Sequence, residues 1–286
     1  MASRSRLLAL TLAGVVVAAT GCAPQKESPT PTVTAPPPCA KDSLPTRTPG
    51  KLTIATDQPA YEPWFRKDKP DSGEGFEAAV AYAVAEKLGY ARSDVTWTRV
   101  KFDTAIAPGP KTFDFDINQF SVTEERKQAV DFSAPYYLVR QTVIALKSSK
   151  IAGKTSLADL RGAKLGAQVG TTSYQAITDV IKPAGKPQVY NSNDDAKKAL
   201  QNGQIDGLVV DLPTAFYITG AEITDATIVG QVPQVGVPEA FGLLLDKNSP
   251  LTRCVSGAVG QLSEAGTLTE LERKWLAQVA GAAELR

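Results

Sequence analysis

The chain has 286 residues, with 31 Lys and Arg against 30 Asp and Glu, and it contains no histidine. A net charge of +1 gives no support for binding to nucleic acid or to an anionic surface. Without histidine, the usual general base and the commonest metal ligand are missing, which disfavours most hydrolases and metalloenzymes. We therefore expect no nucleic-acid partner, no metal and no other cofactor.

Residues 1–21 have the features of an export signal. Arg4 and Arg6 precede an apolar run, Leu7–Ala19, that is too short to span a bilayer comfortably. The run leads into Thr-Gly before Cys22, which resembles a bacterial lipobox, where cleavage before the cysteine creates a lipid-bearing N-terminus. We expect Cys22 to be lipidated. The alternative is an ordinary cleaved signal followed by an incidental cysteine.

Residues 22–50 are rich in proline, and the prolines alternate with Thr, Ser and Lys. Such a segment has few apolar side chains to bury and favours extended polyproline conformations. If Cys22 carries lipid, we expect this segment to be a semi-rigid tether that holds a folded body away from the membrane. Low-complexity sequence without a role remains the alternative.

Two further cysteines, Cys39 and Cys254, remain if Cys22 is lipidated. An exported protein lies in an oxidising compartment, where such a pair favours a disulfide. We expect the bond to connect the end of the tether to a helix near the C-terminus.

From Lys51 onward, strand-like and helix-like patterns alternate. Strands are expected over residues 51–56, 95–100, 115–120, 143–146, 164–169 and 205–210. Helices are expected over 76–88, 173–181, 193–200, 251–262 and 267–279. We expect Asn193 to cap the third of these helices, and Thr267 with Glu270 to open the last as a capping box. This alternation implies an α/β fold with largely parallel sheets.

Several polar residues follow directly after these strands, where ligands bind in open α/β sheets. They are Asp57, Ser121, Thr123, Arg126, Thr171, Thr172 and Asp211. Taken singly, Asp57 is explained as a turn cap, Arg126 as a surface residue and Asp211 as a helix N-cap. Taken together, they suit a zwitterion, because a carboxylate prefers arginine and hydroxyl donors whereas an ammonium prefers a carboxylate.

The motif Asp131–Tyr137, DFSAPYY, is preceded by Ser121–Arg126, SVTEER. This block resembles the signature of the family 3 extracellular solute-binding proteins, the receptors of ABC importers for polar amino acids. Matching pieces continue in order, such as Gly75-Phe76-Glu77 and Gly207–Asp211, and the similarity runs from about Lys51 to Trp275.

The resemblance implies an α/β, two-lobed, type II periplasmic-binding-protein fold with two hinge crossovers. We expect lobe 1 to comprise residues 51–135 and 243–286, and lobe 2 to comprise 141–238. The hinge is expected at 136–140 and 239–242. A ligand would lie in the cleft, and closure of the lobes would bury it.

The resemblance also implies roles for individual residues. Arg126 and Ser121 match residues that hold the α-carboxylate, Thr171 and Thr172 match its donors from lobe 2, and Asp211 matches the acceptor of the α-ammonium. Tyr61 and Phe102 match aromatic walls around the ligand. Asp57 matches a contact to the distal end of the ligand side chain, which favours ligands with N–H donors. Gln119 stands beside the carboxylate site, where a small residue is common.

We therefore expect a monomeric receptor, not an enzyme, that is anchored outside the bacterial cell membrane through Cys22. It would capture a polar or basic amino acid and deliver it to an ABC permease.

Two other functions remain open. A dehydratase that acts on small carboxylates could share this scaffold, but it would need an acid–base pair in the cleft, for which Glu62, Glu77 and Glu239 are candidates. A surface sensor or adhesion module is the second alternative, and it would act through another protein.

Overall fold

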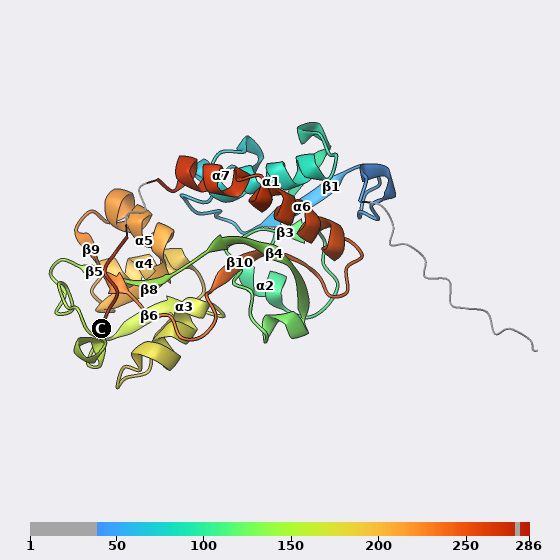
Figure 1. Ribbon diagram of the computed structural model, residues 1–286. Coiled ribbons are helices and arrows are strands. Elements are labelled where there is room, and N and C mark those ends of the chain that lie inside the picture. The colour runs from blue at the N-terminus through green and yellow to red at the C-terminus, as the bar shows by residue number, and fades with distance from the viewer. Residues whose placement is uncertain (1–38, 278–280) are drawn as a thin grey trace, which may run out of the picture. The chain divides into compact units, whose positions relative to one another are not determined.

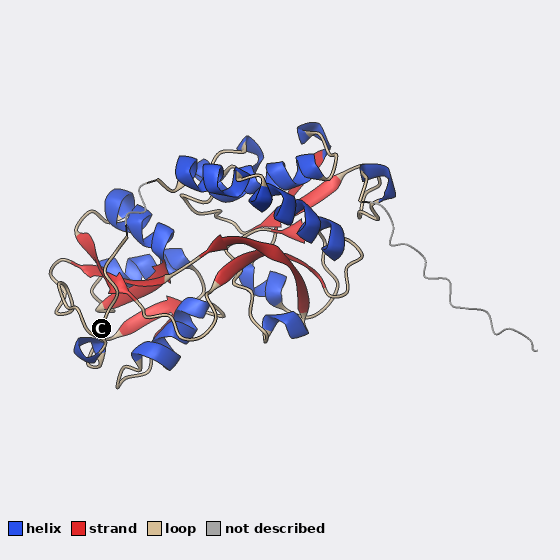
Figure 2. Ribbon diagram, in the orientation of Figure 1, coloured by secondary structure: helices blue, strands red, loops and turns tan. Residues whose placement is uncertain are grey.

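The computed structural model describes residues 39–277 and 281–286. These residues form two five-stranded sheets with helices packed on them (Figures 1 and 2). The segment expected to be an export signal, Cys22, and the part of the expected tether up to residue 38 lie outside the described residues. In the part of the chain that is described, no helix is sufficiently long and apolar to cross a membrane.

The first sheet has the strand order β2-β1-β3-β10-β4. Its strands are β1 Leu52–Thr56, β2 Val95–Arg99, β3 Phe115–Asp116, β4 Val130–Leu138 and β10 Ala240–Asp246. The helices of this lobe are α1 Phe76–Lys87, α2 Phe102–Ile106, α6 Thr252–Glu264 and α7 Thr267–Trp275. Helices α1, α6 and α7 contact one another and bury a common apolar core (Figure 1).

The second sheet has the strand order β7-β6-β8-β5-β9. Its strands are β5 Gln141–Leu146, β6 Leu165–Gln168, β7 Gln188–Tyr190, β8 Gly207–Asp211 and β9 Ala226–Gln231. The helices are α3 Thr172–Gln175, α4 Asn193–Gln201 and α5 Leu212–Tyr217, with π-helical turns at Ala176–Ile181 and Ile218–Glu222. Short 3-10 turns lie at Lys41–Ser43, Arg66–Asp68, Pro70–Ser72, Arg92–Asp94, Arg126–Gln128 and Ala158–Leu160.

The expectation of largely parallel sheets is only partly correct. Strands β2, β1 and β3 are parallel, as are β7, β6 and β8. Strand β10 is antiparallel to β3 and β4, and β5 is antiparallel to β8 and β9. The antiparallel pairs arise where the chain passes between the sheets, because β4 leaves the first sheet in one direction and β10 re-enters it in the other.

The two sheets have separate cores, and each core together with its helices forms one lobe. Two apolar clusters surround the first sheet and two surround the second, and none of the four draws on both. Ala240 pairs with Leu138, so the end of β4 and the start of β10, which we expected in the hinge, belong to the first sheet. The chain passes between the lobes at residues 139–140 and 233–239.

The last residues lie on a different lobe from the one we expected. Residues 281–286 were assigned to the first lobe, but they run along β9 of the second, where the C-terminus is marked in Figure 1. The backbone N–H of Gln231 donates to the carbonyl of Ala283 at 2.8 Å, and that of Leu285 donates to Gln231 at 2.9 Å. Leu285 is 2% exposed and fills the space beside Gly230, where a Cβ would approach it to 2.9 Å.

Two expected helix caps are also wrong. Ser192, rather than Asn193, caps α4, and its Oγ accepts a hydrogen bond from the backbone N–H of Asp195 at 3.1 Å. Helix α7 follows Gly266, whose φ of 74° is favourable for glycine, and no capping side chain bonds there. Thr267 is therefore the first helical residue rather than the start of a capping box.

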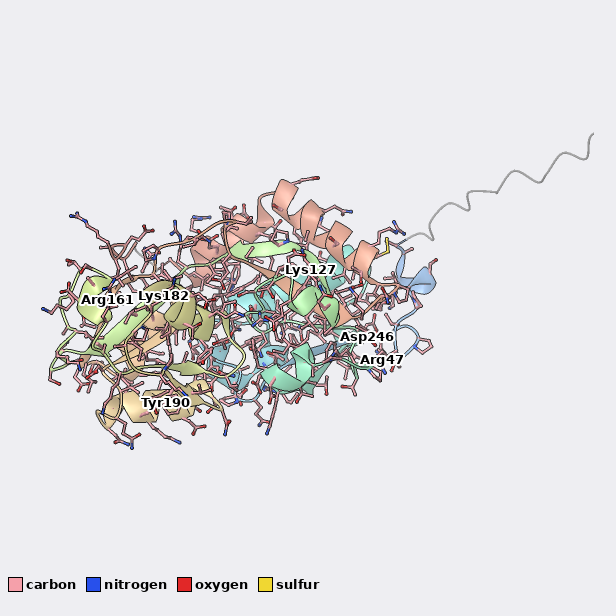
Figure 3. The ribbon with its side chains drawn as sticks, turned by 90° about the horizontal axis from the view of Figure 1, so that it is seen from below. Arg47, Lys127, Arg161, Lys182, Tyr190 and Asp246 are labelled. Carbon is pink, nitrogen blue, oxygen red and sulfur yellow. A yellow bond between two sulfur atoms is a disulfide. The ribbon has the colours of Figure 1, made fainter. Side chains whose placement is uncertain are left out.

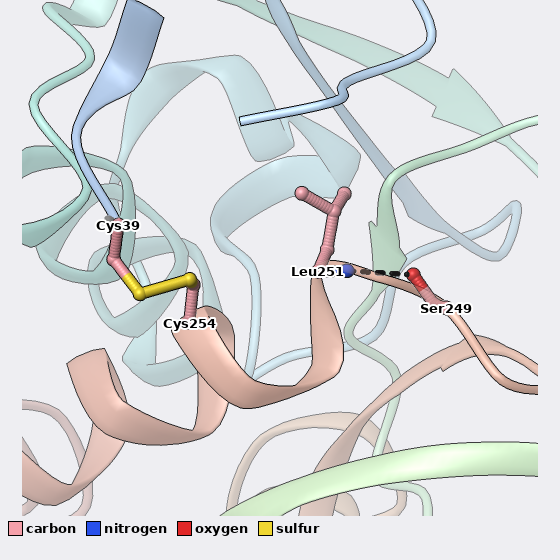
Figure 4. The surroundings of a disulfide bond; sticks show 4 residues. All are labelled: Cys39, Ser249, Leu251 and Cys254. Atoms are coloured by element: carbon pink, nitrogen blue, oxygen red, sulfur yellow. Dashed lines mark hydrogen bonds between the residues drawn. A yellow bond between two sulfur atoms is a disulfide. The ribbon is translucent and has the colours of Figure 1, made fainter. Parts of the chain in front are cut away.

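The expected disulfide joins Cys39 to Cys254, and their Cα atoms are 5.4 Å apart, within the usual range (Figure 4). Cys254 lies in the first turn of α6, close to the hydrogen bond from the Leu251 N–H to Ser249 Oγ. The bond therefore fixes the start of the described chain to the first lobe. Figure 3 shows it as a yellow bond, far from the exposed Arg161 and Lys182 of the second lobe.

Candidate functional site

A small cavity lies between the two lobes, with a volume of about 40 Å³. The cavity is lined by residues of both lobes: Asp57, Tyr61, Phe102, Asn118, Gln119, Arg126, Gln168, Thr171, Thr172, Ser173, Asn193, Val210 and Asp211.

Direct contacts between the lobes show that the cleft is closed. Arg126 Nη2 donates to the carbonyl of Gly170 at 2.9 Å, which links the first lobe to the second. At another point, Trp64 Nε1 donates to Thr214 Oγ1 at 2.9 Å, and both side chains are buried. A ligand in this cavity would therefore be enclosed by both lobes.

The structure brings eight of the nine expected ligand residues to the cavity wall. They are Asp57, Tyr61, Phe102, Gln119, Arg126, Thr171, Thr172 and Asp211. The ninth, Ser121, is 1% exposed and lies behind the wall. Its Oγ donates to Glu239 Oε1 at 2.5 Å and lies 3.2 Å from Thr172 Oγ1.

Arg126 is a buried cation without a paired anion. It begins a 3-10 turn after β3, and its Nη1 donates to the carbonyl of Ser121 at 2.8 Å. The guanidinium lies 5.3 Å from the centre of the Phe102 ring. Burial lowers the pKa of Arg126, and no ion pair holds the side chain within the described part of the chain. Such a group favours the binding of an anion, because an unpaired buried charge is costly.

Asp211 supplies the opposite charge at the carboxyl end of β8. Its Oδ1 accepts a hydrogen bond from Gln141 Nε2 at 2.9 Å. Asp211 precedes α5 but makes no capping bond, and its Oδ2 accepts no hydrogen bond from the residues described. Burial, followed by the charge of Glu239, raises the pKa of Asp211 to about 8. A bound cation would therefore stabilise its ionised form.

Asp57 accepts a hydrogen bond from the first residue of α2 and lines the cavity. Its Oδ2 accepts from the backbone N–H of Phe102, the first residue of α2, at 3.2 Å, and its Oδ1 accepts from Gln58 N–H at 2.6 Å. Burial raises the pKa of Asp57. The interpretation as a cap and the interpretation as a ligand contact are therefore compatible.

Aromatic rings form part of the wall. Phe102 stacks on Phe120 with ring centres 4.9 Å apart, which fixes its orientation. The ring of Tyr61, on the first lobe, lies 5.3 Å from Nζ of Lys197 in α4 of the second lobe. This cation–π contact is another link across the closed cleft.

Thr171 and Gln119 are also engaged in hydrogen bonds within the protein. Thr171 Oγ1 caps α3 by accepting from Tyr174 N–H at 3.2 Å, and it donates to the carbonyl of Gln168 at 2.7 Å. Gln119 has a φ of 48°, in the left-handed region that favours glycine. Its backbone N–H donates to Glu77 Oε1 at 2.7 Å, and its amide donates to Glu77 Oε2.

Several residues in or beside the cavity were not expected as ligand contacts. They are Asn118, Gln141, Ser173, Asn193, Val210 and Glu239. Their residue types give no sign of a binding role. Their positions give some, because Asn118, Ser173 and Val210 each adjoin an expected site residue and Asn193 begins α4. The carboxylates considered for an acid–base pair, Glu62, Glu77 and Glu239, do not line the cavity.

Comparison with known proteins decides the family. The model of the bacterial extracellular solute-binding proteins, family 3, matches residues 52–278. The chain belongs to this family.

Individual relatives agree with this assignment. The probable histidine-binding protein of Campylobacter jejuni is 30% identical over 195 residues, which is 66% of this chain and 70% of that protein. The ABC transporter arginine-binding protein 1 of Escherichia coli K12 is 29% identical over 213 residues, 71% of this chain and 82% of that protein.

Among solved structures, an ancestral arginine-binding protein bound to glutamine superposes with a TM-score of 0.66 at 30% identity, covering 80% of this chain and 98% of that one. The family member described here therefore shares both the family's sequence pattern and its two-lobed fold.

Proposed function

We propose that this family 3 protein is the substrate-binding component of an ABC importer, and that its cleft closes on a polar or basic α-amino acid. In this proposal, Arg126 binds the α-carboxylate and Asp211 accepts hydrogen bonds from the α-ammonium. Tyr61 and Phe102 contact the stem of the ligand, and Asp57 contacts its distal end.

One observation carries the proposal. A buried guanidinium without an anion, Arg126, and a carboxylate with a free oxygen, Asp211, line the same cavity. The two groups come from different lobes, so a ligand that carries both charges would contact both lobes. Its binding energy would then favour the closed arrangement over the open one.

The balance of charge supports a basic ligand. The charged residues lining the cavity are Asp57, Asp211 and Arg126, so the wall carries one more negative charge than positive when all three are ionised. A zwitterion with a positive side chain would balance this excess. Relatives named for histidine and arginine, and an ancestral arginine-binding protein bound to arginine, are consistent with this choice.

The membrane-related part of the proposal rests on the sequence. Cys22 would carry the lipid, residues 22–50 would be the tether, and the two lobes would act as a monomer that docks on a permease. The bond between Cys39 and Cys254 supports this arrangement, because disulfides persist in oxidising compartments outside the cytoplasm.

A thermal-shift panel against all common amino acids, confirmed by calorimetry, tests the proposal on the purified, dialysed protein. A ligand at a hundredfold excess over its Kd adds about 2.7 kcal/mol to the free energy of unfolding. At about 2–4 °C per kcal/mol, the midpoint should rise by roughly 5–10 °C.

We expect arginine, lysine, histidine or glutamine to give the largest shift. Tighter binding of aspartate or glutamate would refute the assigned role of Asp57. If the folded protein responded to none of the amino acids, the proposed function would be wrong.

A further inference from the structure

Gln141 joins the two segments that connect the lobes. It is the first residue of β5, directly after the crossing at residues 139–140, and it is 6% exposed. Its Nε2 donates to Asp211 Oδ1 at 2.9 Å and lies 3.1 and 3.2 Å from the two oxygens of Glu239 in the second crossing. Its Oε1 accepts from Ser173 Oγ at 2.7 Å. The two N–H donors and the carbonyl acceptor of the amide are thus all engaged.

The amide lies between two carboxylates that repel one another. The groups whose charge or dipole acts on Asp211 are Glu239, Glu77 of α1, Arg126, and Tyr136 and Tyr137 of β4. Of these, only Arg126 is a cation, and it forms no ion pair with Asp211 in the described structure. Gln141 is therefore the side chain that donates directly to both Asp211 and Glu239, and its hydrogen bond favours the ionised form of Asp211.

The network continues into the first lobe. Glu239 Oε1 also accepts from Ser121 Oγ at 2.5 Å, and Ser121 Oγ is 3.2 Å from Thr172 Oγ1 of the second lobe. A continuous series of hydrogen bonds therefore runs from Ser121 through Glu239 and Gln141 to Asp211. It passes through the second crossing at Glu239, adjoins the end of the first crossing at Gln141, and ends at the cavity wall.

We propose that Gln141 is a positioning residue for ligand binding: it holds one oxygen of Asp211, leaves the other directed to the ligand ammonium, and ties this orientation to the hinge through Glu239. The ligand-binding part of this inference rests on the proposed function. The hydrogen bond from Gln141 to Asp211 does not depend on that function, and its effect can be measured in the unliganded protein.

The first experiment follows Asp211 without ligand. In protein labelled with ¹³C at the aspartate carboxyls, Asp211 is assigned with Asp211→Asn, and its titration is compared between wild type and Gln141→Leu. We expect the midpoint to move to higher pH in Gln141→Leu, because the ionised form loses its donor. Gln201→Leu, at the exposed end of α4, is the matched control and should leave the titration unchanged. An unchanged Asp211 titration in Gln141→Leu would overturn the inference.

The second experiment measures ligand affinity by calorimetry against pH for the best ligand of the panel. Gln141→Leu removes a hydrogen bond to a charged group, so it should raise Kd about ten- to a hundredfold. The acid side of the affinity profile should also move to higher pH. In an Asp211→Asn background, Gln141→Leu should change Kd little, because the residue acts through Asp211.

Equal losses in both backgrounds would show that Gln141 acts independently of Asp211, and would overturn the positioning role. Wild type could bind no amino acid while the Asp211 titration still differed between wild type and Gln141→Leu. The proposed function would then be wrong, but the effect of Gln141 on Asp211 would be confirmed.

Discussion

Replacing Arg126 with methionine separates ligand binding from folding. Methionine keeps a long, flexible stem in the space against the Phe102 ring but removes the guanidinium. In the unliganded protein, this guanidinium is a buried cation with two backbone acceptors and no anion. If Arg126 serves the ligand rather than the fold, the substitution should weaken binding strongly and lower the stability of the unliganded protein much less.

The expected magnitudes differ for the two properties. A ligand carboxylate left in the cavity without a cation should lose about 2–5 kcal/mol of binding free energy. This corresponds to an increase in Kd of roughly 30- to 5,000-fold. For folding, the loss of two hydrogen bonds costs about 1 kcal/mol each, and removing an unpaired buried charge offsets several kcal/mol. The free energy of unfolding should therefore fall by no more than about 2 kcal/mol.

Calorimetry gives the Kd, and urea unfolding of unliganded protein gives the stability. Lys127→Met is the matched control, because it removes one positive charge from the next residue, which is exposed and does not line the cavity. The control should bind like wild type. Binding by Arg126→Met within about threefold of wild type, less than 1 kcal/mol, would refute the assigned pose. A large loss of stability together with the loss of binding would instead make Arg126 a structural residue.

Three further predictions follow from individual contacts. The raised pKa of Asp211, about 8, means that the folded state binds a proton more tightly than the unfolded state, so stability decreases as pH rises from about 4 to 8. Asp211→Asn should therefore unfold at a higher temperature than wild type at pH 7.5, with a difference that disappears near pH 4; an equal difference at both pH values would contradict this. Leu285→Ala should lower the free energy of unfolding, measured in urea, by about 2–4 kcal/mol, because Leu285 is 2% exposed in the core of the second lobe. Surface changes scatter by about 0.5 kcal/mol, so a smaller loss than this would place the tail outside that core. Replacing Cys39 and Cys254 with serine should lower the free energy of unfolding by up to about 5 kcal/mol, since the bond closes a loop with a sequence separation of 215. Equal stability of the wild type and the double variant under oxidising conditions would count against the bond.

The sequence by itself determined the family, the α/β class and most of the cavity wall. Asp57 and Thr171 lie shortly after β1 and β6, Asp211 ends β8, and the carboxyl ends of parallel strands meet at one edge of a sheet. Local position along the chain therefore predicted spatial proximity. The pairing of Cys39 with Cys254 was also predictable, because only two cysteines remained once Cys22 was set aside.

Only the tertiary structure decided which polar groups are already engaged. Ser121 binds Glu239 behind the wall, Thr171 caps α3, and Gln141 bridges Asp211 and Glu239. These partners are far apart in sequence, apart from the local cap, and hydrogen bonds between distant segments leave no periodic pattern that could be read from one chain.

The placement of the C-terminal tail was decided in the same way. Residues 281–286 follow a helix of the first lobe, which made that lobe the expected location. They pack on the second lobe because Gly230 leaves space for Leu285 and because the edge of β9 offers Gln231 as a backbone partner. Both features lie far from the tail in the sequence, and the tail residues themselves carry no pattern that points to them. The contact therefore becomes visible only in the folded structure.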